Sequence, residues 1–138
     1  MSQKLSWAFG VLFVGFAAVC SFHPAELALG LFTVDRPFNT VHLFSGLLGV
    51  LAGIAGAYQA RLYLWTVGLF YLATSVAGFI AGQVLGSPLN AADNYLNLGI
   101  AAVALYGVFA DDPHLGAWRI PITGRRGVTD FRQPAPRW

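Results

Sequence analysis

Three long stretches of the chain hold hydrophobic residues without one Lys, Arg, Asp or Glu. They run over 5–22, 41–60 and 62–85. A helix needs roughly 20 apolar residues to cross the hydrocarbon core of a bilayer. A fourth uncharged stretch, 95–110, is shorter and reaches that length when the helix starts near Ala91. The pattern predicts an all-α integral membrane four-helix bundle, with helices over about 5–22, 41–60, 62–85 and 91–110.

The segments between these stretches predict where the helices turn. Asn39 or Thr40 can cap the second helix, and Arg61 alone separates the second helix from the third, which predicts a very tight turn there. Ser87-Pro88 suggests a cap and first helical turn before the fourth helix. Asp111-Asp112-Pro113 ends that helix. We therefore expect a transmembrane domain over 1–110 and a cytoplasmic tail over 111–138.

Composition supports a membrane protein. Of 138 residues, 57% are hydrophobic and 10% are charged, whereas soluble domains carry roughly 25% charged residues. The net charge of +2 is too small to indicate a nucleic-acid partner. A single cysteine, Cys20, excludes an internal disulfide and a paired-cysteine metal or redox site.

The basic residues predict an orientation. Four spans place the N-terminus, the Arg61 turn and the tail on one side, and Arg36 on the other. The first side holds all the remaining basic residues, namely Lys4, Arg61, Arg119, Arg125, Arg126, Arg132 and Arg137. Because basic residues concentrate on the cytoplasmic side, we expect both termini in the cytoplasm and the protein in an inner or photosynthetic membrane.

Small residues recur at helical spacing in the second and third stretches. The expected packing positions are Gly46, Gly49, Gly53, Gly56, Gly78, Gly82 and Gly86. Small residues let helix backbones approach closely in lipid. The stripes therefore predict helix-packing faces, which can meet within one chain or between chains. The second and fourth helices also open alike, with Asn39-x-x-His42 and Asn94-x-x-Asn97, which suggests two duplicated hairpins.

His42 heads the first stripe, so it should point into the bundle, near Asn39 and Asn97. One interpretation is a hydrogen-bonded His–Asn clamp between the hairpins. The other is a ligand site in which His42 binds a tetrapyrrole or donates a hydrogen bond to a quinone. No cofactor is predicted outright, although bound lipids are expected. His114 beside Asp111 and Asp112 could hold a metal, but such a group is more often a solvated helix exit, so no metal site is predicted. No residue pattern indicates a catalytic acid–base pair, so we expect a non-enzymatic protein.

The tail differs from the rest of the chain. Its arginines and tryptophans can lie on anionic headgroups or dock on a partner protein. The candidate docking residues are Trp118, Arg119, Arg125, Arg126, Arg132, Arg137 and Trp138.

The motif Asn39-x-x-His42-x-x-x-Gly46, with its echo at Asn94-x-x-Asn97, resembles a family of four-helix bacterial membrane proteins of unknown function. The resemblance covers about 5–110. In that family the fourth helix often carries a histidine where this chain has Asn97, which weakens the case for a paired-histidine site. The resemblance implies fold and topology and assigns no activity. Together these features predict an accessory or scaffolding subunit of a larger membrane complex, of photosynthetic or respiratory type, in contact with lipids and other membrane subunits.

Overall fold

The computed structural model describes residues 1–22, 32 and 35–110. Within these residues the chain forms four helices, α1 (Ser2–Phe22), α2 (Arg36–Ala55), α3 (Ala57–Ala81) and α4 (Ala91–Ala110). By length and composition α1, α2 and α3 can each cross a membrane. The fourth helix is not among these, because three polar residues, Asp93, Asn94 and Asn97, lie in its first two turns. The prediction of an all-α membrane bundle is confirmed.

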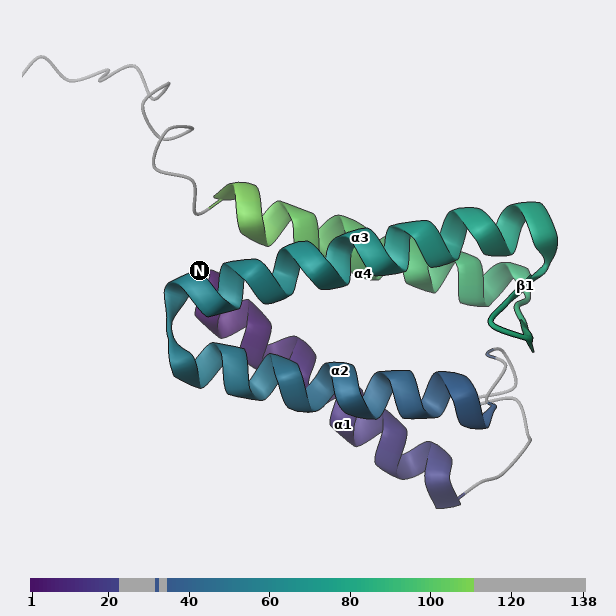
Figure 1. Cartoon of the computed structure of the whole chain (residues 1–138), viewed down its shortest axis with the longest axis horizontal. Coiled ribbons are helices and arrows are strands. Elements are labelled where there is room, and N and C mark those ends of the chain that lie inside the picture. Colours follow the sequence, from purple (N-terminus) through teal and green to yellow (C-terminus); the bar gives the residue numbers. More distant parts are fainter. Residues whose placement is uncertain (23–31, 33–34, 111–138) are drawn as a thin grey trace, which may run out of the picture.

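The helices form two antiparallel pairs, α1 with α2 and α3 with α4, and helix packing is closest within each pair (Figure 1). The two pairs begin at equal spacing. Helix α3 starts at residue 57 against residue 2 for α1, and α4 starts at residue 91 against residue 36 for α2, so both intervals are 55 residues. Helices α2 and α4 also have the same length of 20 residues. This spacing fits the duplication that the two similar helix starts suggest.

The turn between α2 and α3 lies at Gly56 and not at Arg61 as the sequence predicts. Gly56 has φ +136°, a backbone conformation that residues with a Cβ rarely adopt. Arg61 lies inside the first turns of α3 and is half-buried. A glycine therefore makes the reversal, and the second helix ends five residues earlier than its uncharged stretch does.

A short antiparallel hairpin joins α3 to α4. Strand β1 (Gln83–Val84) pairs with β2 (Ser87–Pro88). Leu85 and Gly86 between them both have positive φ, as in the type I′ turns of two-residue hairpins. The prediction that the third helix reaches 85 is therefore wrong, and Ser87-Pro88 forms strand β2 rather than a helix start.

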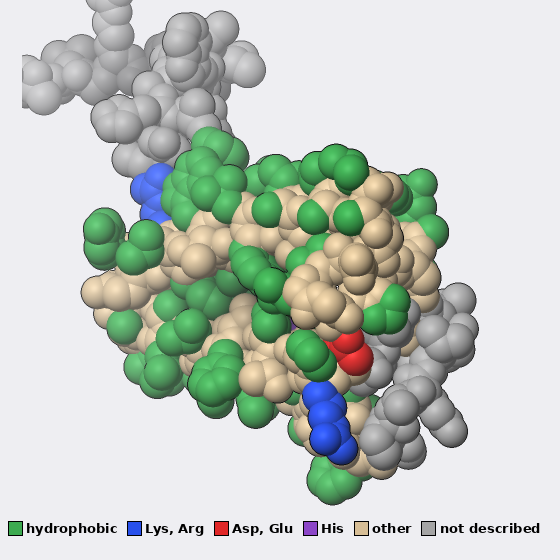
Figure 2. All heavy atoms as spheres, turned by 45° about the vertical axis from the view of Figure 1, so that its right-hand side comes forward, with side chains coloured by type: hydrophobic (Ala, Val, Ile, Leu, Met, Phe, Trp, Pro, Cys, Tyr) green, Lys and Arg blue, Asp and Glu red, His purple; other side chains and the backbone are tan. Residues whose placement is uncertain are grey.

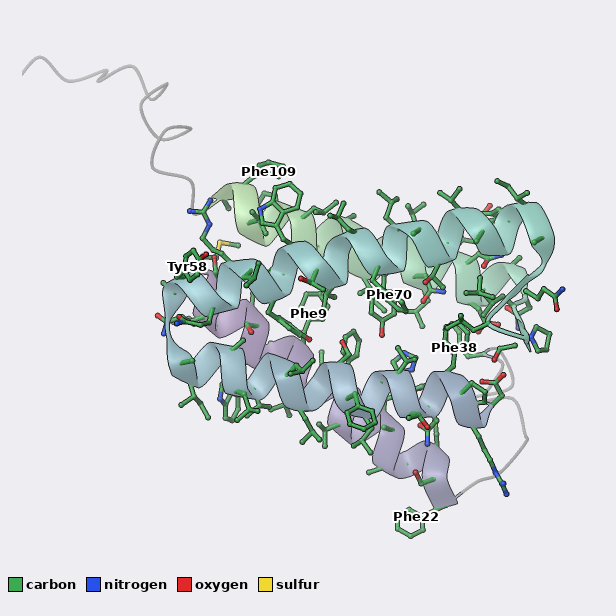
Figure 3. The ribbon with its side chains drawn as sticks, in the orientation of Figure 1. Phe9, Phe22, Phe38, Tyr58, Phe70 and Phe109 are labelled. Carbon is green, nitrogen blue, oxygen red and sulfur yellow. The ribbon has the colours of Figure 1, made fainter. Side chains whose placement is uncertain are left out.

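Aromatic and aliphatic side chains fill the space between the two helix pairs. Phe9 of α1 points into this space, whereas Phe22, Tyr58 and Phe109 point outward (Figure 3). The buried cluster comprises Phe9, Phe13, Tyr63, Leu64, Val67, Tyr71, Ala101, Ala104 and Val108. Hydrophobic side chains cover much of the outer surface, and the acidic side chain visible in Figure 2 lies near a basic one at one end of the bundle. Such a surface suits contact with lipid tails.

Candidate functional site

A cavity lies at the end of the bundle where α1 ends and where α2 and α4 begin. Its volume is about 30 Å³, which is room for about two water-sized groups. Both helix pairs and the hairpin connection contribute to its wall. The lining residues are Phe16, Phe32, Asp35, Phe38, Asn39, His42, Leu89, Asp93, Leu96 and Asn97.

The two carboxylates in this wall belong to helix caps. Asp35 is the N-cap of α2, and its Oδ1 accepts a hydrogen bond from Phe38 N at 3.0 Å. At the start of α4, Asn90 and Asp93 each accept at 2.9 Å from the other's backbone N–H. Such caps satisfy N–H groups that have no partner inside a helix. Asp35 therefore starts α2 four or five residues before Asn39 or Thr40, the caps that the sequence analysis predicts.

His42 bonds to its own helix and not to an asparagine. Its Nδ1 lies 2.8 Å from the carbonyl oxygen of Phe38. A carbonyl oxygen can only accept, so Nδ1 carries the proton and Nε2 of the neutral ring is an acceptor. The ring centroids of Phe13, Phe16 and Tyr71 lie 5.2–6.0 Å from that of the imidazole. The His–Asn clamp is therefore not formed, and aromatic rings hold the imidazole instead.

The two asparagines of the expected site line the same cavity as His42. Asn39 Nδ2 donates to Ser21 Oγ at 3.0 Å, and Ser21 donates in turn to the Ala17 carbonyl at 2.8 Å. Asn39 Oδ1 is buried without a hydrogen-bond partner. Asn97 is only 5% exposed. Among the described residues its carboxamide makes no hydrogen bond, so a buried polar group in the cavity wall has no protein partner.

Asn94 lies outside this site. Its backbone carbonyl accepts a hydrogen bond from Ser75 Oγ at 2.8 Å. Its side chain lies against Gly78, where an added Cβ would collide with the carboxamide. Asn94 thus helps to pack α4 against α3.

The glycines of α2 lie against α1, and Gly49 also lies against Tyr63 of α3. A Cβ at Gly46 would lie 2.7 Å from Val14 N, and one at Gly10 would lie 2.5 Å from Val50 N. Ser6 Oγ donates to the Gly49 carbonyl at 2.8 Å. A Cβ at Gly53 would lie 3.1–3.2 Å from atoms of Gln3 and Trp7. These contacts are made within one chain.

Three of the expected packing glycines lie at helix ends or in a turn instead. Gly56 separates α2 from α3, Gly82 is the left-handed C-cap of α3, and Gly86 lies in the hairpin turn. A Cβ at Gly82 or Gly86 would meet nothing within 4 Å. Their role is conformational, because all three have positive φ.

Two tyrosine hydroxyls between the helix pairs were not predicted as part of a site. The hydroxyls of Tyr63 and Tyr71 are buried without a hydrogen bond, and Ser45 of α2 is the polar side chain close to both. Tyr71 stacks on Phe13 at 5.4 Å. The predicted docking residues of the tail, Trp118 to Trp138, lie outside the described residues.

A family model described as "Domain of unknown function (DUF4383)" matches residues 3–110. The chain belongs to this family, which confirms the resemblance to a membrane family of unknown function. No curated protein and no solved structure matches the chain.

Proposed function

We propose that this DUF4383 protein is a non-enzymatic accessory subunit of a larger membrane complex, docked through the outer face of α4 and through the tail. The observation that carries the proposal is Gly99. It lies in the middle of α4, and a Cβ built there would meet nothing within 4 Å. Gly15 of α1 is open in the same way, whereas Gly46, Gly49, Gly68 and Gly78 each have a neighbour that a Cβ would strike.

The face around Gly99 has the composition of a helix-packing surface. Tyr95, Gly99, Ala102 and Tyr106 follow one another at spacings of four, three and four, and all four are exposed. Glycine costs a helix roughly 0.5–1 kcal/mol relative to alanine, and lipid tails give no reason to keep it. Close approach of another helix does give one. This face therefore supports a partner helix lying across α4.

We propose that the end of the bundle that carries Lys4 and Arg61 faces the cytoplasm of an inner or photosynthetic membrane. Helix α1 starts at this end, α2 turns into α3 there, and α4 finishes there (Figure 1). The tail therefore leaves the membrane on the side where its arginines favour it. Cytoplasmic parts of the partner complex would then be within reach of the tail.

Binding of a tetrapyrrole or quinone by His42 has weaker support. A cavity of about 30 Å³ is smaller than the several hundred Å³ that enclose a drug-sized ligand. The rings of Phe13, Phe16 and Tyr71 also occupy the space beside the imidazole where a macrocycle would lie.

The test is affinity purification from native membranes. The chain would carry an N-terminal tag, be extracted in mild detergent, and its companions would be identified by mass spectrometry. We expect partner subunits in stoichiometric amounts. A chain ending at Pro113 and a Gly99→Leu variant should each lower their recovery at least about tenfold, a change equivalent to about 1.4 kcal/mol.

The matched control is Ala73→Leu. Ala73 is also a small exposed residue, but it lies on α3, so the added side chain should leave partner recovery unchanged. Isolation of the wild-type chain as a monomer, with no companion in stoichiometric amount, would contradict the proposal.

A further inference from the structure

The cavity at the start of α2 and α4 holds more free hydrogen-bond acceptors than donors. Asp35 uses only one carboxylate oxygen, Oδ1, in capping. His42 Nε2 is an acceptor because Nδ1 donates to Phe38 O. The Asn39 amide group already donates to Ser21. Asn97 is 5% exposed and makes no hydrogen bond with the residues that the structure describes, so its carboxamide adds one acceptor oxygen and two N–H donors. One further N–H remains on Asn39. Such a wall calls for a ligand that donates several hydrogen bonds.

The other lining groups favour a positive charge on that ligand. Asp35 and Asp93 bring two carboxylates, and a charge-assisted hydrogen bond is roughly twice as strong as a neutral one. The rings of Phe16, Phe32 and Phe38 complete the wall, and aromatic faces attract cations. Among the described residues, no group of three or more His, Cys, Asp or Glu side chains is placed to hold a metal ion. The favoured cation is therefore organic.

The size of the cavity limits which organic cation can bind. About 30 Å³ accepts one or two water-sized groups. A primary ammonium with its first methylene fits this space, whereas a trimethylammonium group is too bulky. The cavity also lies at an end of the bundle, where helices begin and end, which is the depth of lipid headgroups.

We propose that this cavity binds a primary ammonium group, carried by the headgroup of an aminophospholipid such as phosphatidylethanolamine. Asp35 and Asn97 accept its N–H bonds, His42 Nε2 accepts a third, and the phenylalanine rings surround the methylene next to the nitrogen. The proposal goes beyond the accessory role and does not depend on it.

The test compares two lipids that differ in the headgroup alone. The full chain would be reconstituted in nanodiscs with equal amounts of phosphatidylethanolamine and phosphatidylcholine of identical acyl chains. After release into detergent, native mass spectrometry counts the lipids that stay bound. We expect at least about a fivefold excess of phosphatidylethanolamine, equivalent to about 1 kcal/mol. Equal retention of the two lipids would overturn the proposal.

Two variants test whether the lipid binds at this cavity. Asp35→Asn keeps a good N-cap and removes the charge, and Asn97→Leu keeps the approximate shape and removes the amide. Each should bring the lipid ratio close to one. Thr66→Val, at an exposed position of α3 away from the cavity, should leave the ratio unchanged. A preference that survives in both cavity variants would overturn the assignment.

Free ethanolamine separates the two sources of the ammonium group. If millimolar ethanolamine displaces the lipid, the site recognises any small primary amine. If it does not, the lipid's glycerophosphate and acyl chains contribute to binding. Circular dichroism and size-exclusion chromatography would report whether each variant is folded. If Asn97→Leu does not fold, the lipid ratio measured with Asp35→Asn decides the outcome.

Discussion

The two helix pairs start at the same 55-residue spacing along the chain, but their helices pack in different ways. In α1–α2 the contact is backbone against backbone, because Gly10 and Gly46 leave no room for a Cβ on either helix. In α3–α4 side chains separate the helices, with Gly68 facing Leu105 and Gly78 facing Asn94. Each pair also has a serine hydroxyl that donates to a carbonyl of the other helix at 2.8 Å, from Ser6 and Ser75.

Equal spacing along the chain therefore does not require that the two helix pairs pack in the same way. Gly46 and Gly49 of α2 correspond in the 55-residue spacing to Ala101 and Ala104 of α4, which are 1% and 0% exposed. At the cavity, His42 corresponds to Asn97 in the same way. The histidine is bonded to its own helix, whereas the asparagine has no hydrogen-bond partner among the residues that the structure describes. The corresponding buried positions hold small residues in both helix pairs, whereas the polar residues at the cavity differ in their hydrogen bonding.

The largest effect is expected from Gly46→Ala. The new Cβ would lie 2.7 Å from Val14 N and 2.9 Å from Gly10 O, and backbone atoms can move aside only if the whole helix does. We expect a loss of about 1–3 kcal/mol in the free energy of unfolding, measured by SDS titration in mixed micelles. Gly15→Ala is the control, since a Cβ there meets nothing within 4 Å. Equal effects of the two changes would contradict backbone packing.

A smaller effect is expected from Gly78→Ala. Its nearest neighbours are the side chains of Asn94 and Leu89, which can turn aside at the cost of about 1 kcal/mol for displaced rotamers. The same titration, run beside Gly46→Ala, compares the two pairs directly. If Gly78→Ala is the more destabilising of the two, the contrast drawn between the pairs is wrong.

The smallest effect is expected from Ser6→Ala and Ser75→Ala. Each removes one hydroxyl-to-carbonyl bond of the same length, and such bonds in membrane proteins contribute about 0.6 kcal/mol on average. We expect nearly equal losses in the two pairs. A loss of about 2 kcal/mol or more for one serine alone would show that its helix pair depends on that bond rather than on packing.

The sequence predicted the helix bounds well where the hydrophobic stretch begins or ends next to polar residues. The fourth helix has the predicted bounds 91–110 and the first begins three residues before its uncharged stretch. The second helix was misjudged at both ends. Asp35-Arg36-Pro37 is a cap followed by a first-turn proline, and Gly56 reverses the chain five residues before Arg61. Uncharged length indicates that a membrane can be crossed, but turns follow backbone conformation.

The candidate site was predicted in part. The sequence placed His42, Asn39 and Asn97 together because helix starts at one end of an antiparallel bundle meet, and all three line one cavity. Their hydrogen bonds were not predictable. Whether His42 bonds to Asn97 or to Phe38 depends on where the rings of Phe13, Phe16 and Tyr71 pack. That packing is set by contacts between distant parts of the chain.

The inner glycines of α2 and α3 pack against neighbours within the chain, and we propose that Gly99 packs against a partner helix. The most direct test is photo-cross-linking in native membranes, with a photoreactive amino acid at position 99 or, as control, at position 73. We predict one protein adduct from position 99 and none from position 73. Adducts to lipid alone at both positions would contradict the claim.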